Sequence, residues 1–367
     1  MRCLIISAEF PPKTGGAGIV AYNLADYFVS KQIDVEIITL RNHNRLLEKY
    51  PFSIEEICSI PKLSIITMAN TVKAIRPERY DVIIANDIGA TLALGLSCNV
   101  PLQKKTYIFL HGSEPEIIFE YPSFLYRLLN VQSIYSTVLV NSHKIFAVSK
   151  HMKDKFLLKT GLLTLNSKIK VFYSGIDFYK FYPDVINIKR EYELNFSTKL
   201  LLSVGRIEKQ KGFLIKYEIF KELLAQGMDL HWFIVGRGQF EKHLKSLVRK
   251  DSLQNRITFC GYMEGDSLRK IYSSVDVFWL LSQYEEAFGL VYIESIACGT
   301  PVLGCPNGGV SEIIKEDING YLVGDFEDGK QKVKLALSHI WNTTLMKESI
   351  EKFNRDLTLS KLLKILT

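Results

Sequence analysis

The sequence predicts an α/β protein with two domains, each built on a parallel sheet that has helices on both faces. The chain has 367 residues, which is too long for one ordinary core and suits two domains. Its composition, 47% hydrophobic and 23% charged, is that of a globular protein. Short apolar runs alternate with segments of helical length, and this alternation stops and then starts again in the middle of the chain.

In the first half, each expected strand is a short apolar run, which is the pattern of a strand buried on both faces. Strands are expected at 3–7, 35–40, 81–85, 106–110, 144–148 and 170–173, and helices at 19–30, 65–75, 124–140 and 150–158. The aromatic run 177–184 breaks this rhythm, and 186–198 has a mixed composition. We therefore expect a first domain over 1–180 and a linker over 181–198.

The alternation starts again after residue 198. Strands are expected at 200–204, 232–235, 257–260, 277–280, 301–303 and 321–323, and helices at 213–226, 240–250, 267–274 and 290–297. Only helical patterns remain after about residue 325. We expect the second domain over 199–344 and the helices of 345–367 to return to the first domain. In such sheets ligands bind beyond the carboxyl ends of the strands.

Composition also bears on where the protein works. The six cysteines lack the spacing of a metal site, and several lie in apolar runs, which indicates a reducing compartment. The first apolar run ends at Glu9 and no later run approaches 18 residues, so we expect neither a signal peptide nor a membrane span. The expected location is the cytoplasm. The net charge of +7 indicates either an ordinary basic surface, which is the default, or attraction to anionic lipids or phosphorylated ligands.

Two segments in the first half follow strands and are suited to ligand binding. The glycine-rich run 9–18 precedes a helix, whose first N–H groups can bind an anion, but a tight structural turn explains the run equally well. His111 follows strand 106–110 and precedes Gly112. A histidine there can donate to a sugar hydroxyl or transfer a proton, and a structural histidine is an equal alternative.

Two cations follow the first strand of the second half. Arg206 lies on the loop and Lys211 at the start of the next helix, where both can reach one diphosphate. Arginine binds two oxygens at once, and lysine adds a compact positive charge. The nearby Lys209 leaves open which lysine is used. A solvated basic loop is the alternative, and the pair together makes it the less favoured one.

The most informative segment is 284–294. Glu286 follows a strand, and Gly289 opens an apolar helix whose second turn contains Glu294. A carboxylate in such a helix is costly unless it has a partner, and ribose hydroxyls are suitable donors. The helix start also directs N–H groups towards phosphate. An ordinary acidic residue near a helix start explains Glu286 almost as well, but it leaves Glu294 unexplained.

Taken together, these segments resemble the family 4 glycosyltransferases, which have the GT-B fold, over nearly the whole chain. The most specific element is the pair Glu286 and Glu294 in E-A-F-G-L-V-Y-I-E, followed by A-C-G-T-P-V and N-G-G-V-S-E. Supporting elements are P-P-K-T-G-G-A-G, His111-Gly112, S-V-G-R-I-E-K-Q-K-G and F-Y-S-G-I-D-F-Y-K-F-Y-P, where Ser174 replaces a more usual asparagine. The resemblance implies two Rossmann-like domains that face a deep cleft.

The resemblance also implies roles for individual residues. Arg206 and Lys211 would hold the leaving diphosphate, Glu286 would contact the transferred sugar, Glu294 would bind the ribose, and His111 would lie beside the reacting centre. The other donor-binding residues are expected to be Phe288, Gly289, Leu290, Gly16 and Gly236. The acceptor-binding residues are expected to be Gly15 and His111.

The resemblance implies a retaining transfer that uses no cofactor and no metal ion, and the sequence has no D-x-D motif or histidine cluster near these loops. A same-face substitution, assisted by an oxygen of the leaving phosphate, is the favoured mechanism. The expected partners are a nucleotide-sugar donor and a saccharide or lipid-linked saccharide acceptor, with no nucleic acid. A pathway for bacterial surface polysaccharide or lipopolysaccharide is expected.

Segments 123–129 and 156–159 mix aromatic, aliphatic and basic residues and could rest on the inner face of the cytoplasmic membrane. For either segment alone, a core-packing helix with a basic outer edge is the favoured explanation. Two other functions stay open, a nucleotide-sugar epimerase on the same fold and a non-catalytic protein that binds sugar nucleotides.

Overall fold

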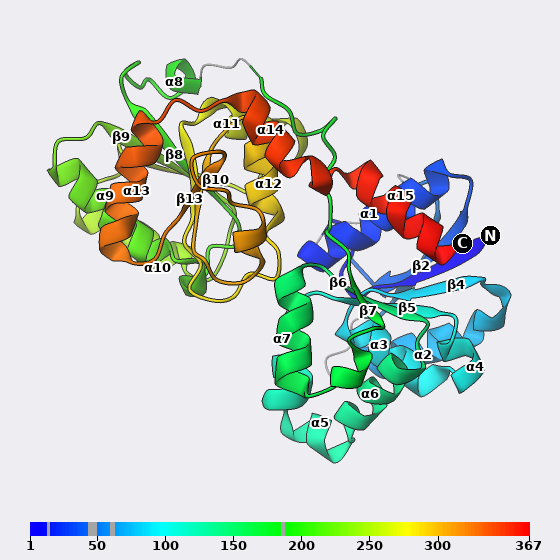
Figure 1. Ribbon diagram of the computed structural model, residues 1–367. Helices are drawn as coiled ribbons and strands as arrows, with labels where there is room; N and C mark the ends of the chain where they lie inside the picture. Colours follow the sequence, from blue (N-terminus) through cyan, green and yellow to red (C-terminus); the bar gives the residue numbers. More distant parts are fainter. Residues whose placement is uncertain (13–14, 43–49, 59–62, 185–187) are drawn as a thin grey trace. The chain divides into compact units, whose positions relative to one another are not determined.

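The computed structural model describes residues 1–12, 15–42, 50–58, 63–184 and 188–367 (Figure 1). The chain divides into two compact units. The first contains Met1–Ser174 and Thr358–Thr367, and the second contains Gly175–Leu357. The described part of the expected linker 181–198 therefore belongs to the second unit, as do residues 345–357, which we expected to join the first domain.

The described residues of the first unit form a seven-stranded parallel sheet in the order β3-β2-β1-β4-β5-β6-β7. Its strands are β1 (Arg2–Ile6), β2 (Asp34–Leu40), β3 (Ser53–Ile57), β4 (Val82–Ala85), β5 (Thr106–Leu110), β6 (Lys144–Ala147) and β7 (Ile169–Val171). The strand order reverses between β1 and β4, which is where ligands bind in sheets of this kind. We did not expect the edge strand β3, because Glu55 and Glu56 interrupt its apolar pattern.

The helices of the first unit are α1 (Gly16–Ser30), α2 (Ser64–Ala74), α3 (Ile88–Ser97), α4 (Val100–Gln103), α5 (Phe124–Leu128), α6 (Val131–Asn141) and α7 (Lys150–Thr160). The single helix expected over 124–140 is wrong, because Asn130 has a left-handed backbone, with φ +48°, and separates α5 from α6. We did not expect α3, which contains two glycines; Asp87 caps it by accepting a hydrogen bond from the Ala90 N–H.

The described residues of the second unit form a six-stranded parallel sheet in the order β10-β9-β8-β11-β12-β13. Its strands are β8 (Lys199–Val204), β9 (Leu230–Val235), β10 (Ile257–Gly261), β11 (Val277–Leu280), β12 (Val302–Gly304) and β13 (Gly320–Leu322). The order reverses between β8 and β11. The helices are α8 (Ile188–Glu191), α9 (Phe213–Ala225), α10 (Glu241–Lys250), α11 (Gly265–Ser274), α12 (Leu290–Ala297), α13 (Phe326–Ser338) and α14 (Thr343–Ile350).

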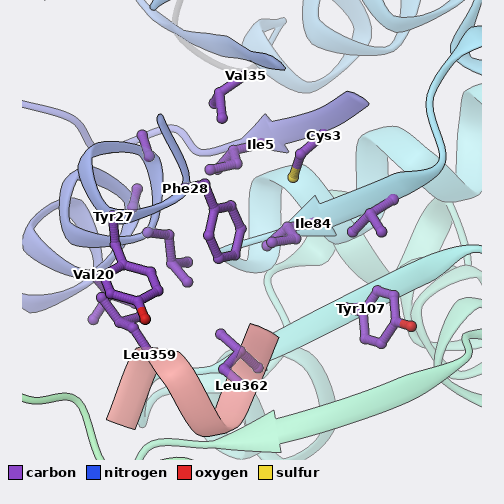
Figure 2. Packing of buried hydrophobic residues seen from close by; sticks show 14 of the residues in the cluster. Cys3, Ile5, Val20, Tyr27, Phe28, Val35, Ile84, Tyr107, Leu359 and Leu362 are labelled. Carbon is purple, nitrogen blue, oxygen red and sulfur yellow. The ribbon is translucent and has the colours of Figure 1, made fainter. Parts of the chain in front are cut away.

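The last helix, α15 (Arg355–Leu366), completes the core of the first unit. Leu359 and Leu362 are buried in the same hydrophobic cluster as Phe28 of α1 and Ile84 of β4 (Figure 2). Removing these leucines from water favours the attachment of the C-terminal segment by about 2 kcal/mol each. The two ends of the sequence thus share one core.

Candidate active site

The loops that follow β8 and β11 meet at the point where the strand order of the second sheet reverses. The first loop carries Arg206 and continues into the helical turn η5 (Lys209–Lys211). The second loop runs from Leu281 to Gly289, and α12 follows it. The backbone N–H of Gln283 donates to the carbonyl of Gln210 over 2.8 Å, so the two loops are held directly together.

Lys211 and Glu286 form an ion pair between these loops. The distance from Lys211 Nζ to Glu286 Oε1 is 2.7 Å, and both side chains are almost buried. The hydroxyl of Ser282 donates to the same carboxylate oxygen. Burial alone would lower the pKa of Lys211, but the charges of Glu286 and Tyr284 outweigh it and raise the pKa, so this lysine stays protonated.

Tyr284 lies among the charged groups of the site. The ammonium of Lys211 is 4.8 Å from the centre of its ring. Burial and the charge of Glu286 raise the pKa of the Tyr284 hydroxyl, while Lys211 and Arg206 act to lower it. Arg206 is therefore close enough to this ring to influence it electrostatically. Its own side chain is 70% exposed and pairs with Glu208 over 3.2 Å, which leaves the guanidinium accessible to a ligand.

Glu294 is buried on α12 at 8% exposure. The Tyr272 hydroxyl donates to Glu294 Oε2 over 3.0 Å. Burial raises the pKa of Glu294 to about 7, although the hydrogen bond from Tyr272 opposes the shift. Near neutral pH this side chain can therefore bind a ligand hydroxyl by changing its protonation, at a position where a purely structural glutamate would be unfavourable.

The start of α12 is built by Phe288, Gly289 and Leu290. Gly289 has φ +104°, in the region that favours glycine, and directly precedes the helix. Phe288 is buried, with its ring centre 5.2 Å from that of Phe353. Leu290 is the first residue of the helix. The structure thus places a helix N-terminus immediately after Glu286, with the dipole direction that favours phosphate.

Gly236 follows β9 and lies against the loop after β8. Its φ is +129°, and a Cβ atom there would be 1.9 Å from the carbonyl oxygen of Gly205. Gly236→Ala should therefore lower the free energy of unfolding by roughly 2 kcal/mol or more, measured by chemical denaturation. Gly227→Ala is the matched control, because Gly227 also has a positive φ of +84° but no atom within 4 Å of its Cβ position. Equal losses in the two variants would contradict the proposed steric role.

In the first unit, residues that follow β1, β4 and β5 form a second polar cluster. Nδ2 of Asn86 donates to the Ser7 hydroxyl over 3.1 Å and to the Ala17 carbonyl over 2.8 Å. Nε2 of His111 lies 3.2 Å from Asn86 Oδ1. Burial lowers the pKa of His111 to about 4, so the ring is neutral at pH 7 and donates this hydrogen bond as its Nε2–H tautomer.

The glycine-rich run precedes α1, although its Lys13 and Thr14 lie outside the described residues. The Gly15 N–H donates to Glu9 Oε2 over 3.0 Å, so the chain's own carboxylate occupies this N–H. A Cβ on Gly15 would lie 2.6 Å from that oxygen, whereas a Cβ on Gly16 would meet no atom within 4 Å. The space beside Gly16 is therefore open to a ligand. Gly15, Gly16 and His111 belong to the first unit, and the other candidate residues belong to the second.

Sequence reasoning missed four side chains that support the candidate residues. They are Asn86, Tyr272, Ser282 and Tyr284. Among them, Ser282 and Asn86 directly follow apolar strands, which is the signal that could have identified them. A cavity of about 490 Å³ lies elsewhere in the second unit, between the end of α12 and α14, and is lined by residues such as Pro183, Gly299 and Lys347. It includes none of the candidate residues.

Two further searches cover the described residues only. Within them, no group of three or more histidine, cysteine, aspartate and glutamate side chains has an arrangement that could hold a metal ion. In the same part of the chain, no helix combines the length and apolar character needed to cross a membrane.

Comparisons with known proteins agree with this geometry. The family model for glycosyl transferases group 1 matches residues 184–342, and the model for glycosyltransferase family 4 matches residues 14–179. An uncharacterized glycosyltransferase of Methanocaldococcus jannaschii is 27% identical over 343 residues, which cover 88% of this chain and 85% of the relative. The N-acetyl-alpha-D-glucosaminyl L-malate synthase of Bacillus anthracis is 24% identical over 330 residues, covering 86% of this chain and 82% of the relative.

Among solved structures, the chain is similar to Anabaena HepE in complex with UDP and glucose. The TM-score is 0.79 and the identity 19%, with 100% of this chain and 99% of the other covered. This likeness confirms the GT-B fold that the sequence predicts. The two family models together span both units. The chain therefore belongs to the family 4 glycosyltransferases, whose donor-side motif is the Glu286 and Glu294 segment described above.

Proposed function

We propose that this glycosyltransferase moves a sugar from a nucleotide-sugar donor to a saccharide or lipid-linked saccharide, with retention of anomeric configuration and without a metal ion. One observation carries the proposal. Lys211 and Glu286 are in contact at the reversal point of the second sheet, with Arg206 on the adjoining loop and the start of α12 directly behind Glu286. Two cations and a helix N-terminus suit a diphosphate, and a carboxylate suits sugar hydroxyls.

The ion pair suggests how the site changes when the donor binds. Before binding, Lys211 is neutralised by Glu286. A diphosphate would attract the ammonium of Lys211, and the Ser282 hydroxyl would continue to hold the carboxylate of Glu286, which then accepts from hydroxyls of the sugar. Glu294, one helical segment away, would accept from the ribose hydroxyls.

In the proposed reaction, the bond between the anomeric carbon and the phosphate oxygen breaks, and the oxygen takes both electrons of that bond. The acceptor oxygen forms the new bond on the same face of the sugar. Its proton passes to an oxygen of the leaving phosphate. Arg206 and Lys211 would stabilise the charge that develops on the diphosphate, which is the task that a metal ion performs in other transferases. Activity should therefore persist in the presence of a chelator.

A panel of nucleotide sugars tests the proposal. The matching donor should stabilise the folded protein by about 2.7 kcal/mol at 100 times its Kd, seen as a rise in Tm. With an acceptor, the released nucleotide and the anomeric configuration of the product, determined by NMR, report the reaction. Conversion of the donor into an epimer without acceptor would replace the proposal by an isomerase. Binding with no transfer to any acceptor would replace it by a non-catalytic binding protein.

The proposal includes a cytoplasmic location with peripheral contact at the inner face of the membrane, in a pathway for bacterial surface polysaccharide or lipopolysaccharide. What supports this part is the surface of the first unit, where apolar side chains are exposed on short helices beside basic residues.

A further inference from the structure

The positive charge of the chain is concentrated in one segment. Residues 121–176 contain eight lysines and arginines and a single acidic residue, Asp154. The surplus of seven equals the net charge of the whole chain, so the remaining 311 residues are balanced overall. No acidic residue lies between Glu120 and Asp154. A charge excess confined to one part of a surface indicates an anionic partner for that part.

The start of this segment exposes large apolar side chains. None of the five residues of α5 is buried. Phe124 is 81% exposed and Leu128 69%, and Tyr121, which precedes the helix, is 77% exposed. Leu125 and Leu129 are also exposed, and we call these five residues the 121–129 face. Single exposed apolar residues are common on soluble proteins, but five within nine residues mark an interaction surface.

The surroundings of the face are helices of the first unit. The helix α5 packs against α6, and the π-helical turn η3 (Pro115–Glu120), which leads into the face, packs against both α6 and α7. In Figure 1, α5 lies at an edge of the unit. The acidic side chains of η3 are already occupied, because Lys159 binds Glu116 at 2.7 Å and Glu120 at 3.0 Å. The charge within the face itself comes from Arg127, whose side chain donates to the Pro122 carbonyl over 3.0 Å.

We propose that the 121–129 face docks onto a lipid bilayer that contains anionic lipids. Phe124, Leu128 and Tyr121 would enter the boundary between headgroups and acyl chains, and Arg127 would lie at the level of the phosphates. A second copy of the chain is a poorer occupant, because a two-fold contact through this face would bring Arg127 close to its symmetry mate without an acidic residue of the face between them.

This inference deepens the proposed function, since it rests on that proposal for the lipid-linked acceptor, which docking would bring to the enzyme in the plane of the membrane. The docking itself needs neither donor nor acceptor. Vesicle binding measured without substrates therefore fails or succeeds independently of glycosyl transfer.

The test is flotation of the full chain with vesicles of phosphatidylcholine alone and of phosphatidylcholine with 30% phosphatidylglycerol. We expect binding to the anionic vesicles that weakens at high salt. The double variant Phe124→Ser, Leu128→Ser should bind roughly tenfold or more weakly, since it removes two insertable side chains. Arg127→Glu should also weaken binding to the anionic vesicles. These side chains are exposed, so the Tm of each variant should stay unchanged, which is measured in parallel.

Ile340→Ser is the matched control, because Ile340 is 94% exposed in the second unit, and it should bind vesicles like the parent protein. Undiminished binding by the double variant would overturn the proposal. The absence of binding to anionic vesicles would do the same. Sedimentation that shows a dimer dissociated by the double substitution would assign the face to self-association instead.

Discussion

Arg206→Ala should lower turnover by about 10²–10³-fold while leaving the stability of the protein unchanged. The side chain is 70% exposed and pairs with Glu208 over 3.2 Å, and an exposed pair of this kind contributes 1 kcal/mol or less, as an order of magnitude. Its loss therefore cannot act through unfolding. If the guanidinium stabilises the leaving diphosphate, its removal raises the barrier to transfer. Steady-state kinetics together with a denaturation curve separate the two effects.

Lys209→Ala is the matched control, since Lys209 is exposed on the same loop and decides whether any nearby cation matters or only these two. We expect it to retain nearly full activity. Turnover in Arg206→Ala equal to that of the parent enzyme would remove this residue from the leaving-group role.

Lys211 requires a different design, because it also supports the fold. Lys211→Met leaves the carboxylate of Glu286 almost buried without its cation and should cost ~3 kcal/mol of stability. The double variant Lys211→Met, Glu286→Gln removes both charges and should recover much of that stability, yet it should remain inactive. Recovery of activity along with stability would show that the pair serves only the fold. Glu285→Gln, a change at the exposed neighbour, should alter neither property.

The sequence was sufficient for the core of both sheets but not for their edges. Strand 106–110 and helix 290–297 were predicted to the residue, because a buried apolar run between turn signals has few alternatives. Strand β3 was missed because an edge strand exposes side chains such as Glu55 and Glu56, and its pattern resembles that of a loop. The break at Asn130 depends on one backbone conformation that periodicity does not reveal.

The same difference holds for the site. The proximity of Lys211 and Glu286 could be anticipated from topology, since loops after neighbouring parallel strands share one edge of the sheet. The hydrogen bonds from Ser282 and Tyr272 could not, because they depend on side-chain directions within a loop and between two helices. The family match tests neither these contacts nor the individual roles, which stay predictions for the variants above.

Glu294 should make the stability of the protein depend on pH in a direction opposite to that of an ordinary surface carboxylate. Burial raises its pKa from 4.5 to about 7 in the folded state. Between these values the folded protein holds a proton that the unfolded chain has lost, so stability falls as the pH rises from about 4.5 to 7 and then levels. The cost of keeping the ionised group folded is about 3 kcal/mol above pH 7.

Glu294→Gln removes this titration and keeps the shape of the side chain. The variant should therefore be more stable than the parent protein above pH 7, by up to about 3 kcal/mol, and the difference should shrink towards pH 4.5. The comparison cancels the contributions of other buried groups, such as His111, that both proteins share. Denaturation curves at pH 5, 6, 7 and 8 measure it. A difference that does not change with pH would mean that Glu294 does not titrate in this range.

Donor binding should reverse the penalty. Ribose hydroxyls that donate to Glu294 favour its ionised form, so nucleotide binding should lower the pKa and release about 0.9 proton at pH 6. Titration calorimetry in two buffers with different ionisation enthalpies counts that proton. The affinity of the parent protein should then rise towards pH 7 and level above it, whereas Glu294→Gln should bind more weakly above pH 7 and without this pH dependence. Equal proton release by the two proteins would place the ribose elsewhere. The raised pKa would then be only a consequence of burial, because a carboxylate that contacts the nucleotide must give up its proton to accept the hydroxyls.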